Sequence, residues 1–175
     1  MRRILLVDDE ENVLKSLRRL LRSESFEVEI CSNPLEAIAR AKVVSFDLVV
    51  SDYRMPQMDG VSFLKEFRQL QPDAIRLILS AYTDLSALLG AINEAQIYRF
   101  VSKPWNDQEL LVTLAQALEF RDLLLENQRL ADQVREQQGI ISRQELALKD
   151  LEREHPAIAH VDRDEDGAII LDDDL

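Results

Sequence analysis

The sequence predicts an α/β fold: a doubly wound parallel sheet of five strands, with helices on both faces and a last helix extended into a coiled coil. Three observations predict it. A short apolar or alternating run occurs five times, and a stretch with apolar residues at helical spacing follows each run. Polar residues stand where the apolar runs end. No proline lies between Pro104 and Pro156, and a heptad pattern covers much of that stretch.

The first two strands differ in how much burial their patterns predict. Residues 4–7 are all apolar, which favours a fully buried strand, and a helix with apolar positions from Val13 to Leu21 follows. Residues 27–31 alternate with period two, as in a half-buried edge strand. Asn33 is expected to cap the second helix, with Pro34 at its first position.

The rest of the sheet follows the same alternation. The expected strands are residues 46–51, 74–79 and 97–101, and the expected helices between them are residues 60–70 and 84–95. Either Asn106 or Asp107 caps the long last helix.

Composition excludes several classes of protein. The net charge of -12 argues against non-specific binding to nucleic acid or to anionic membranes. Cys31 is the only cysteine, so a disulfide framework and a thiolate zinc site are excluded, and a place in the core is expected for it. No apolar run approaches membrane-spanning length, so we expect a cytoplasmic protein without a membrane partner.

Polar side chains gather at one edge of the predicted sheet, because the carboxyl ends of parallel strands share an edge. They are Asp8 and Asp9 after the first strand, Asp52 after the third, Ser80 after the fourth and Lys103 after the fifth. Clustered carboxylates repel one another and favour a hard cation such as Mg²⁺, while a lysine and a hydroxyl can bind phosphoryl oxygens. The set suits phosphoryl transfer to Asp52. Singly, Asp8 could instead be a helix cap, Lys103 a solvated lysine and Phe100 a core residue.

The motifs VDDEENV (7–13), MPQMDG (55–60), LSA (79–81) and FVSKPW (100–105) resemble the receiver domain of two-component response regulators. The resemblance covers residues 1–120 and implies a flavodoxin-like (βα)5 fold with strand order 2-1-3-4-5. It also implies a histidine kinase as phosphoryl donor and Mg²⁺ as cofactor. The chain would then be no enzyme beyond its own phosphoryl transfer and autodephosphorylation.

The resemblance assigns roles to individual residues. Asp52 would be the phosphoacceptor, and Mg²⁺ would bind Asp8, Asp9, Asp52 and the backbone carbonyl of Arg54. Ser80 and Lys103 would contact the phosphoryl group, and the Lys103-Pro104 peptide bond would be cis. Phe100 would be a switch aromatic that moves inward with Ser80. Arg54 and Tyr82 would flank the route of the hydrolytic water, and their size favours slow dephosphorylation.

The long last helix carries a heptad seam, a row of residues spaced alternately by three and four that is typical of coiled coils. The heptad seam consists of Phe120, Leu123, Asn127, Leu130, Val134, Gln137, Ile141, Gln144, Leu148 and Leu151. We expect a parallel homodimer through residues 120–151; the alternative is a solitary polar helix or one that folds back on its own domain. We divide the chain into a receiver (1–120), a coiled coil (121–154) and an acidic tail (155–175). The tail is expected to be a hairpin or disordered. A calcium loop from Asp162 is a weaker alternative, because its twelfth residue is Asp173 rather than glutamate.

The output of such a receiver is open on sequence alone. We favour a module that signals through its coiled coil and tail to an unknown protein partner, because no basic stretch or helix-turn-helix pattern follows the receiver. For the same reason we expect no direct contact with nucleic acid. The alternative is a regulatory fragment of a larger cyclic-di-GMP enzyme or transcription regulator, since SAYTDL and IYRFVSKPW resemble receivers attached to HD-GYP-type phosphodiesterases.

Overall fold

The computed structural model describes residues 2–22, 26–81 and 95–154, and it divides the chain into two compact units, Met1–Glu126 and Asn127–Leu175. Tyr82, the helix expected over residues 84–95 (apart from Ala95) and the acidic tail therefore lie outside the described residues. The strands are β1 (Arg2–Val7), β2 (Phe26–Cys31), β3 (Leu48–Asp52), β4 (Ile75–Ala81) and β5 (Arg99–Lys103). The helices are α1 (Glu11–Leu21), α2 (Pro34–Ala41), α3 (Gly60–Leu70) and α6 (Asp107–Glu154).

The five strands form one parallel sheet in the order β2-β1-β3-β4-β5, which confirms the predicted topology. The strand ends differ from the prediction by one or two residues. Asp52 pairs with Leu79, and Lys103 pairs with Ala81, so both polar residues belong to their strands instead of following them. This pairing fixes their backbones as part of the sheet.

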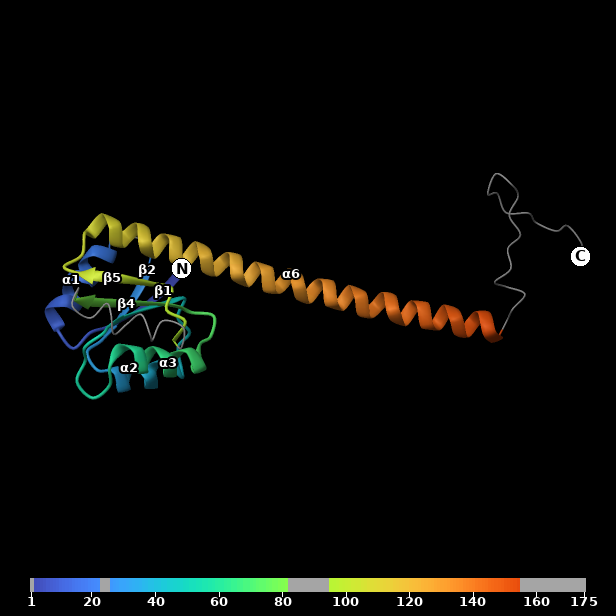
Figure 1. The fold of residues 1–175 in the computed structure, drawn as a ribbon, viewed down its shortest axis with the longest axis horizontal. Helices are drawn as coiled ribbons and strands as arrows, with labels where there is room; N and C mark the ends of the chain where they lie inside the picture. The colour runs from blue at the N-terminus through green and yellow to red at the C-terminus, as the bar shows by residue number, and fades with distance from the viewer. Residues whose placement is uncertain (1, 23–25, 82–94, 155–175) are drawn as a thin grey trace, which may run out of the picture. The chain divides into compact units, whose positions relative to one another are not determined.

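Helices cover both faces of the sheet (Figure 1). On one face, α2 and α3 pack through a cluster that includes Ile38, Phe63 and Phe67. On the other face, α1 and the first turns of α6 pack through a second cluster, which includes Leu17 and Leu114. The inner strands contribute to both clusters because successive side chains point to opposite faces. β2 is half-buried, as its alternation predicted for an edge strand.

Side-chain caps fix where the helices begin. The Asn33 side chain accepts a hydrogen bond from the Leu35 amide, and Pro34 follows it, as predicted. Asn106, rather than Asp107, caps α6, because its Oδ1 accepts hydrogen bonds from the amides of Gln108 and Glu109.

At the amino edge of the sheet, Asp47 connects three strands and α6. Its amide donates to the Arg3 carbonyl, and its carbonyl accepts from the Ile75 amide. Its carboxylate accepts from the Arg3 amide at 2.7 Å and pairs with the Arg121 guanidinium at 2.8 Å. Arg121 also donates to the Asp73 carbonyl. The part of α6 around Arg121, in the first unit, is therefore fixed to the amino edge of the sheet, opposite the carboxyl ends of the strands.

Arg76 is a charged side chain inside the first unit, only 5% exposed. Its guanidinium donates to the carbonyls of Pro72, Ala74 and Ala95 at 2.6–3.1 Å. Burial, together with the nearby charge of Arg68, lowers the pKa of Arg76 to about 10. Arg76 thus connects the segment before β4 with residues just before β5.

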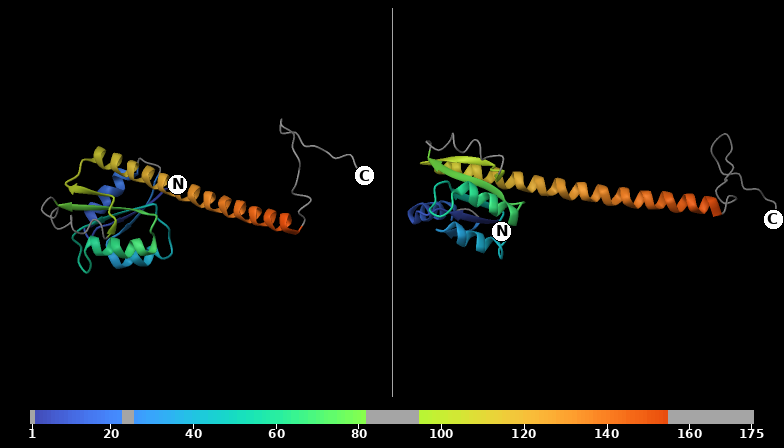
Figure 2. Two further views of the ribbon diagram at one scale, coloured as in Figure 1. Left: turned by 45° about the vertical axis from the view of Figure 1, so that its right-hand side comes forward. Right: turned by 60° about the horizontal axis from the view of Figure 1, so that its bottom comes forward.

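The second unit is described over residues 127–154, all of them in α6, and α6 is one unbroken helix (Figure 2). In this part every described residue is exposed except Gly139, which is partly buried. Within the described part of the chain, no helix has the length and apolar character needed to span a bilayer.

Candidate functional site

Three carboxylates meet at the carboxyl edge of the sheet. Asp8, Asp9 and Asp52 each offer an oxygen, and these oxygens lie within 4.8 Å of one another. Strand register brings them together: Val7 pairs with Ser51, so the residues that follow, Asp8 and Asp52, are neighbours. Asp8 and Asp52 are 0% and 6% exposed, whereas Asp9 is exposed. Two of the three carboxylates are therefore held away from bulk water.

Lys103 joins the two buried carboxylates. Its Nζ lies 2.8 Å from Asp8 Oδ2 and 2.7 Å from Asp52 Oδ1. Its side chain is 20% exposed, so the alternative of a solvated surface lysine is wrong. The Lys103-Pro104 peptide bond is cis, as the resemblance implied.

The pKa values of this pair respond to burial and to each other. Burial raises the pKa of Asp52 above its usual value, with a further contribution from Asp8, and the hydrogen bond and charge of Lys103 only partly offset the rise. Burial alone would lower the pKa of Lys103, but its hydrogen bonds to Asp52 and Asp8 outweigh this and raise it. Lys103 thus stays a cation beside Asp52, whose charged form is disfavoured by burial.

Asp8 is not the helix cap of α1, because the N-cap is Glu10 and α1 has no side-chain cap hydrogen bond. Asp8 Oδ1 instead accepts a hydrogen bond from the Glu10 amide at 2.8 Å, just before α1. Its Oδ2 is the atom that meets Lys103. The turn before α1 therefore fixes the orientation of the Asp8 carboxylate.

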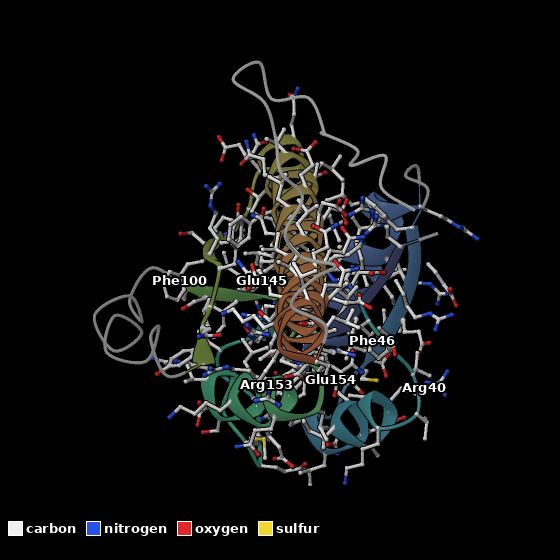
Figure 3. The ribbon with its side chains drawn as sticks, turned by 90° about the vertical axis from the view of Figure 1, so that its right-hand side faces the viewer. Arg40, Phe46, Phe100, Glu145, Arg153 and Glu154 are labelled. Carbon is white, nitrogen blue, oxygen red and sulfur yellow. The ribbon has the colours of Figure 1, made fainter. Side chains whose placement is uncertain are left out.

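The other predicted residues lie around this cluster. Ser80 is 4% exposed, and its hydroxyl donates to the Ala81 carbonyl at 3.1 Å. Phe100 is half-buried on β5, beside Ile78 in register, and packs against the cluster on the α2–α3 face (Figure 3). Arg54 is exposed in the loop after β3, and the role of its backbone carbonyl stays a prediction.

Gly60 is needed at this site for a reason that the sequence did not show. In the sequence it is the last residue of the MPQMDG motif (55–60). A Cβ on Gly60 would lie 2.0 Å from the Asp52 carbonyl oxygen. The Gly60 amide also donates to the Tyr53 carbonyl at 2.8 Å. The absence of a side chain therefore lets α3 begin directly against the end of β3.

The donor set fits a divalent cation that prefers oxygen. All three groups are carboxylates, two are buried, and no nitrogen or sulfur ligand takes part in the cluster of described residues. Such hard donors suit Mg²⁺ or Ca²⁺ rather than a thiophilic metal.

Residues 4–115 match the family profile described as Response regulator receiver domain. The chain belongs to the response regulator receiver family. A receiver domain is a phosphoryl-accepting signalling module of two-component systems, and the carboxylate cluster lies where the resemblance placed its acidic site.

Relatives of this receiver differ in what their names say about output. The hydrogenase transcriptional regulatory protein HoxA of Bradyrhizobium diazoefficiens is 36% identical over 140 residues, 80% of this chain and 29% of HoxA. The solved receiver domain of an HD domain-containing protein from Pseudomonas fluorescens Pf-5 is 39% identical. Its TM-score is 0.68, over 71% of this chain and 92% of that one. A structure described as adenylate cyclase from Rhodopirellula baltica is 32% identical, with a TM-score of 0.71 over 75% and 97%.

The chain thus spans less than a third of the curated relative's length. Proteins named for different activities share this similarity. It therefore concerns the receiver and leaves the output of the signal undecided.

Proposed function

We propose that Asp52 accepts a phosphoryl group from a histidine kinase, and that α6 carries the resulting change to a protein partner. The observation that supports this most is the pairing of Lys103 with both buried carboxylates, next to a third carboxylate. A lysine that bridges two buried carboxylates costs free energy of desolvation, so such an arrangement is a poor way to stabilise a fold.

The chemistry follows from these atoms. A carboxylate oxygen of Asp52 attacks phosphorus, the new O–P bond forms as the N–P bond of the donor phosphohistidine breaks, and the imidazole leaves. Asp8, Asp9 and Asp52 would hold Mg²⁺, which when bound supplies positive charge to neutralise the phosphoryl oxygens. Lys103 offers its ammonium to a phosphoryl oxygen in place of the Asp52 oxygen it now contacts.

Ser80 and Phe100 would report the modification. The Ser80 hydroxyl now donates to the backbone at Ala81, and rotation of its side chain would let it donate to a phosphoryl oxygen instead. Phe100 is only half-buried, so it can move further inward. Such a movement would alter the surface of β5 and α6. Arg54 beside the site, with Tyr82, would slow hydrolysis by restricting the approach of water.

Mass measurement tests the assignment of Asp52. The protein is incubated with a small acyl phosphate and MgCl₂, and intact mass is recorded. We expect one added phosphoryl group in the wild type and none in Asp52→Asn, while Asp59→Asn serves as a matched acidic control that is still labelled. Equal labelling of Asp52→Asn would contradict the assignment, and labelling that is unchanged by a chelator would contradict the magnesium site.

We propose two copies joined by the heptad seam as the signalling form, and a protein rather than nucleic acid as its direct partner, because the net charge is -12. The second candidate is the regulatory part of a longer transcription regulator or cyclic-di-GMP enzyme. Similarity to HoxA, named as a transcriptional regulatory protein, and to the receiver of an HD domain-containing protein favours it. The mass of the protein isolated from its natural source separates the two.

A further inference from the structure

From Asn127 onward the heptad seam is a row of exposed side chains on α6, most of them apolar. Val134, Ile141 and Leu148 are 51%, 54% and 58% exposed, although each is an aliphatic side chain on a long helix. An isolated helix gains little stability from propensity alone, and most helices rely on burying an apolar face. The row therefore calls for an occupant, and its pattern identifies which one.

The row is interrupted by three amides, at Asn127, Gln137 and Gln144. A buried amide that faces an aliphatic side chain loses its hydrogen bonds to water without replacing them. An occupant of the row must therefore present polar groups at the same three levels and apolar groups at the others. A second copy of this chain, parallel and in register, does this at every level, because each seam residue then faces the same residue of the other copy.

Other alignments of two copies leave mismatches. In the antiparallel alignment that overlaps residues 120–151, Asn127 meets Gln144, but Val134 meets Gln137, and symmetry makes this mismatch occur twice. In a parallel alignment shifted by one heptad, Asn127 meets Val134 and Gln144 meets Leu151. Of these three alignments, the parallel, in-register pair alone has no amide against an aliphatic side chain.

The flanking positions do not oppose this alignment. From Asn127 onward, the a positions of the seam are Asn127, Val134, Ile141 and Leu148, and the d positions are Leu130, Gln137, Gln144 and Leu151. In a parallel pair, the residue before an a position of one helix faces the residue after the next d position of the other helix. These flanking contacts are Glu126 with Ala131, Gln133 with Gln138 and Ile140 with Glu145. No like charges meet, and one of the contacts joins two amides.

The receiver contacts a different face of α6 from the seam, apart from Phe120, whose ring lies 5.2 Å from the ring of Tyr98. Leu110, Leu114, Ala117 and Leu118 face the sheet and are at most 3% exposed. At about 100° per residue, the first seam residues, Phe120 and Leu123, point roughly 135° away from that row. Phe120 and Leu123 are 42% and 64% exposed. Pairing through the seam therefore leaves the sheet-facing contacts of α6 in place.

We infer that α6 binds the α6 of a second copy of this chain, parallel and in register, with Asn127, Gln137 and Gln144 each facing the same residue of the second copy. The inference deepens the proposed two-copy signalling form and rests on it, but it does not depend on phosphorylation of Asp52.

Cysteine cross-linking of the full chain tests the orientation. Cys31 is first replaced by serine, so that the introduced cysteine is the only one. Leu148→Cys places a thiol near one end of the seam. In the parallel pair the two thiols are adjacent, whereas in the antiparallel pair they are about 37 Å apart along the axis. Gln137→Cys, near the middle of the seam, brings two thiols close in either orientation. Asp132→Cys, on the opposite face of the helix, is the matched control.

After mild oxidation we expect Leu148→Cys and Gln137→Cys to run mainly as disulfide-linked dimers, and Asp132→Cys to remain mainly monomeric on a denaturing gel. Cross-linking of Gln137→Cys without Leu148→Cys would overturn the parallel orientation. No cross-linking in either, with a monomer mass by light scattering at tens of micromolar, would overturn pairing altogether. Phosphoryl labelling of the same variants reports separately on Asp52, so failure of the pairing and failure of the proposed phosphorylation are distinguishable.

Discussion

The two parts of α6 place similar side chains in opposite surroundings. Leu110 and Leu114, in the first unit, are each 1% exposed, whereas Leu148 and Leu151, in the second, are each 58% exposed. The residue type is the same and so is the helix. The difference is that the first unit supplies a sheet to cover its leucines, while the described residues of the second unit supply nothing. An apolar row on a helix thus becomes core or interface according to what the same chain folds against it.

The largest test of this contrast compares two identical substitutions. Leu114→Ala removes buried methyl groups and should lower the free energy of unfolding of the receiver by about 2–5 kcal/mol. Leu148→Ala should leave receiver unfolding unchanged and weaken only the association of two copies. Urea denaturation followed by tryptophan fluorescence measures the first effect, because Trp105, the single tryptophan, packs against the same cluster as Leu114. Equal losses from both substitutions would break the contrast.

A smaller effect is expected at Arg76, where the first unit buries a polar group rather than an apolar one. Arg76→Met keeps an unbranched side chain but removes the donors that satisfy the carbonyls of Pro72, Ala74 and Ala95. Buried acceptors left without donors should lower the free energy of unfolding by about 1–3 kcal/mol. Arg19→Met, on the exposed face of α1, is the control and should change stability by less than about 0.5 kcal/mol. Thermal unfolding of the two variants side by side measures the difference.

The smallest effect is expected at the Asp59 cap of α3, which extends the contrast to an exposed side chain of the first unit. Burial would raise the pKa of Asp59, but hydrogen bonds from the Ser62 hydroxyl and from the Ser62 and Val61 amides outweigh it, and the pKa is lowered. A carboxyl with a lowered pKa in the folded state stabilises the protein above its unfolded pKa, near 4, and loses that contribution as the pH falls through the folded value. Asp59→Ala should cost about 1 kcal/mol at neutral pH.

The pH dependence provides the control for that substitution. The difference in unfolding free energy between the wild type and Asp59→Ala should shrink as the pH is lowered below about 4. A difference that stays constant from pH 7 to pH 3 would show that the charge of Asp59 has no part in the cap.

The sequence was sufficient for the fold because its signals are local. Alternating and apolar runs, the Asn33 cap and the prolines each act within a few residues, and they located every described strand along the chain. The order of the strands in the sheet came from the resemblance to receiver domains. The placement of Asp8 beside Asp52 was also accessible, because parallel strands must end at one edge.

Contacts that depend on distant parts of the chain were not accessible. Arg76 stands in a strand pattern like any interrupting polar residue, and its carbonyl partners include Ala95, 19 residues away. Lys103 was expected to meet a phosphoryl group, yet in the structure it pairs with Asp8, 95 residues earlier. The closeness of Gly60 to the Asp52 carbonyl depends on how α3 returns to β3. Each depends on loop paths that no local pattern encodes.

The three amides of the heptad seam have a consequence for a cell that holds many similar receivers. A foreign coiled coil with aliphatic residues at those levels would leave each amide without a partner, at about 1–3 kcal/mol apiece. A difference of 1.4 kcal/mol is a factor of ten in association, so even one mismatch lets the chain sort itself from a mixture of subunits. The positions of Asn127, Gln137 and Gln144 would then insulate one signalling pathway from its paralogues, before any kinase has acted.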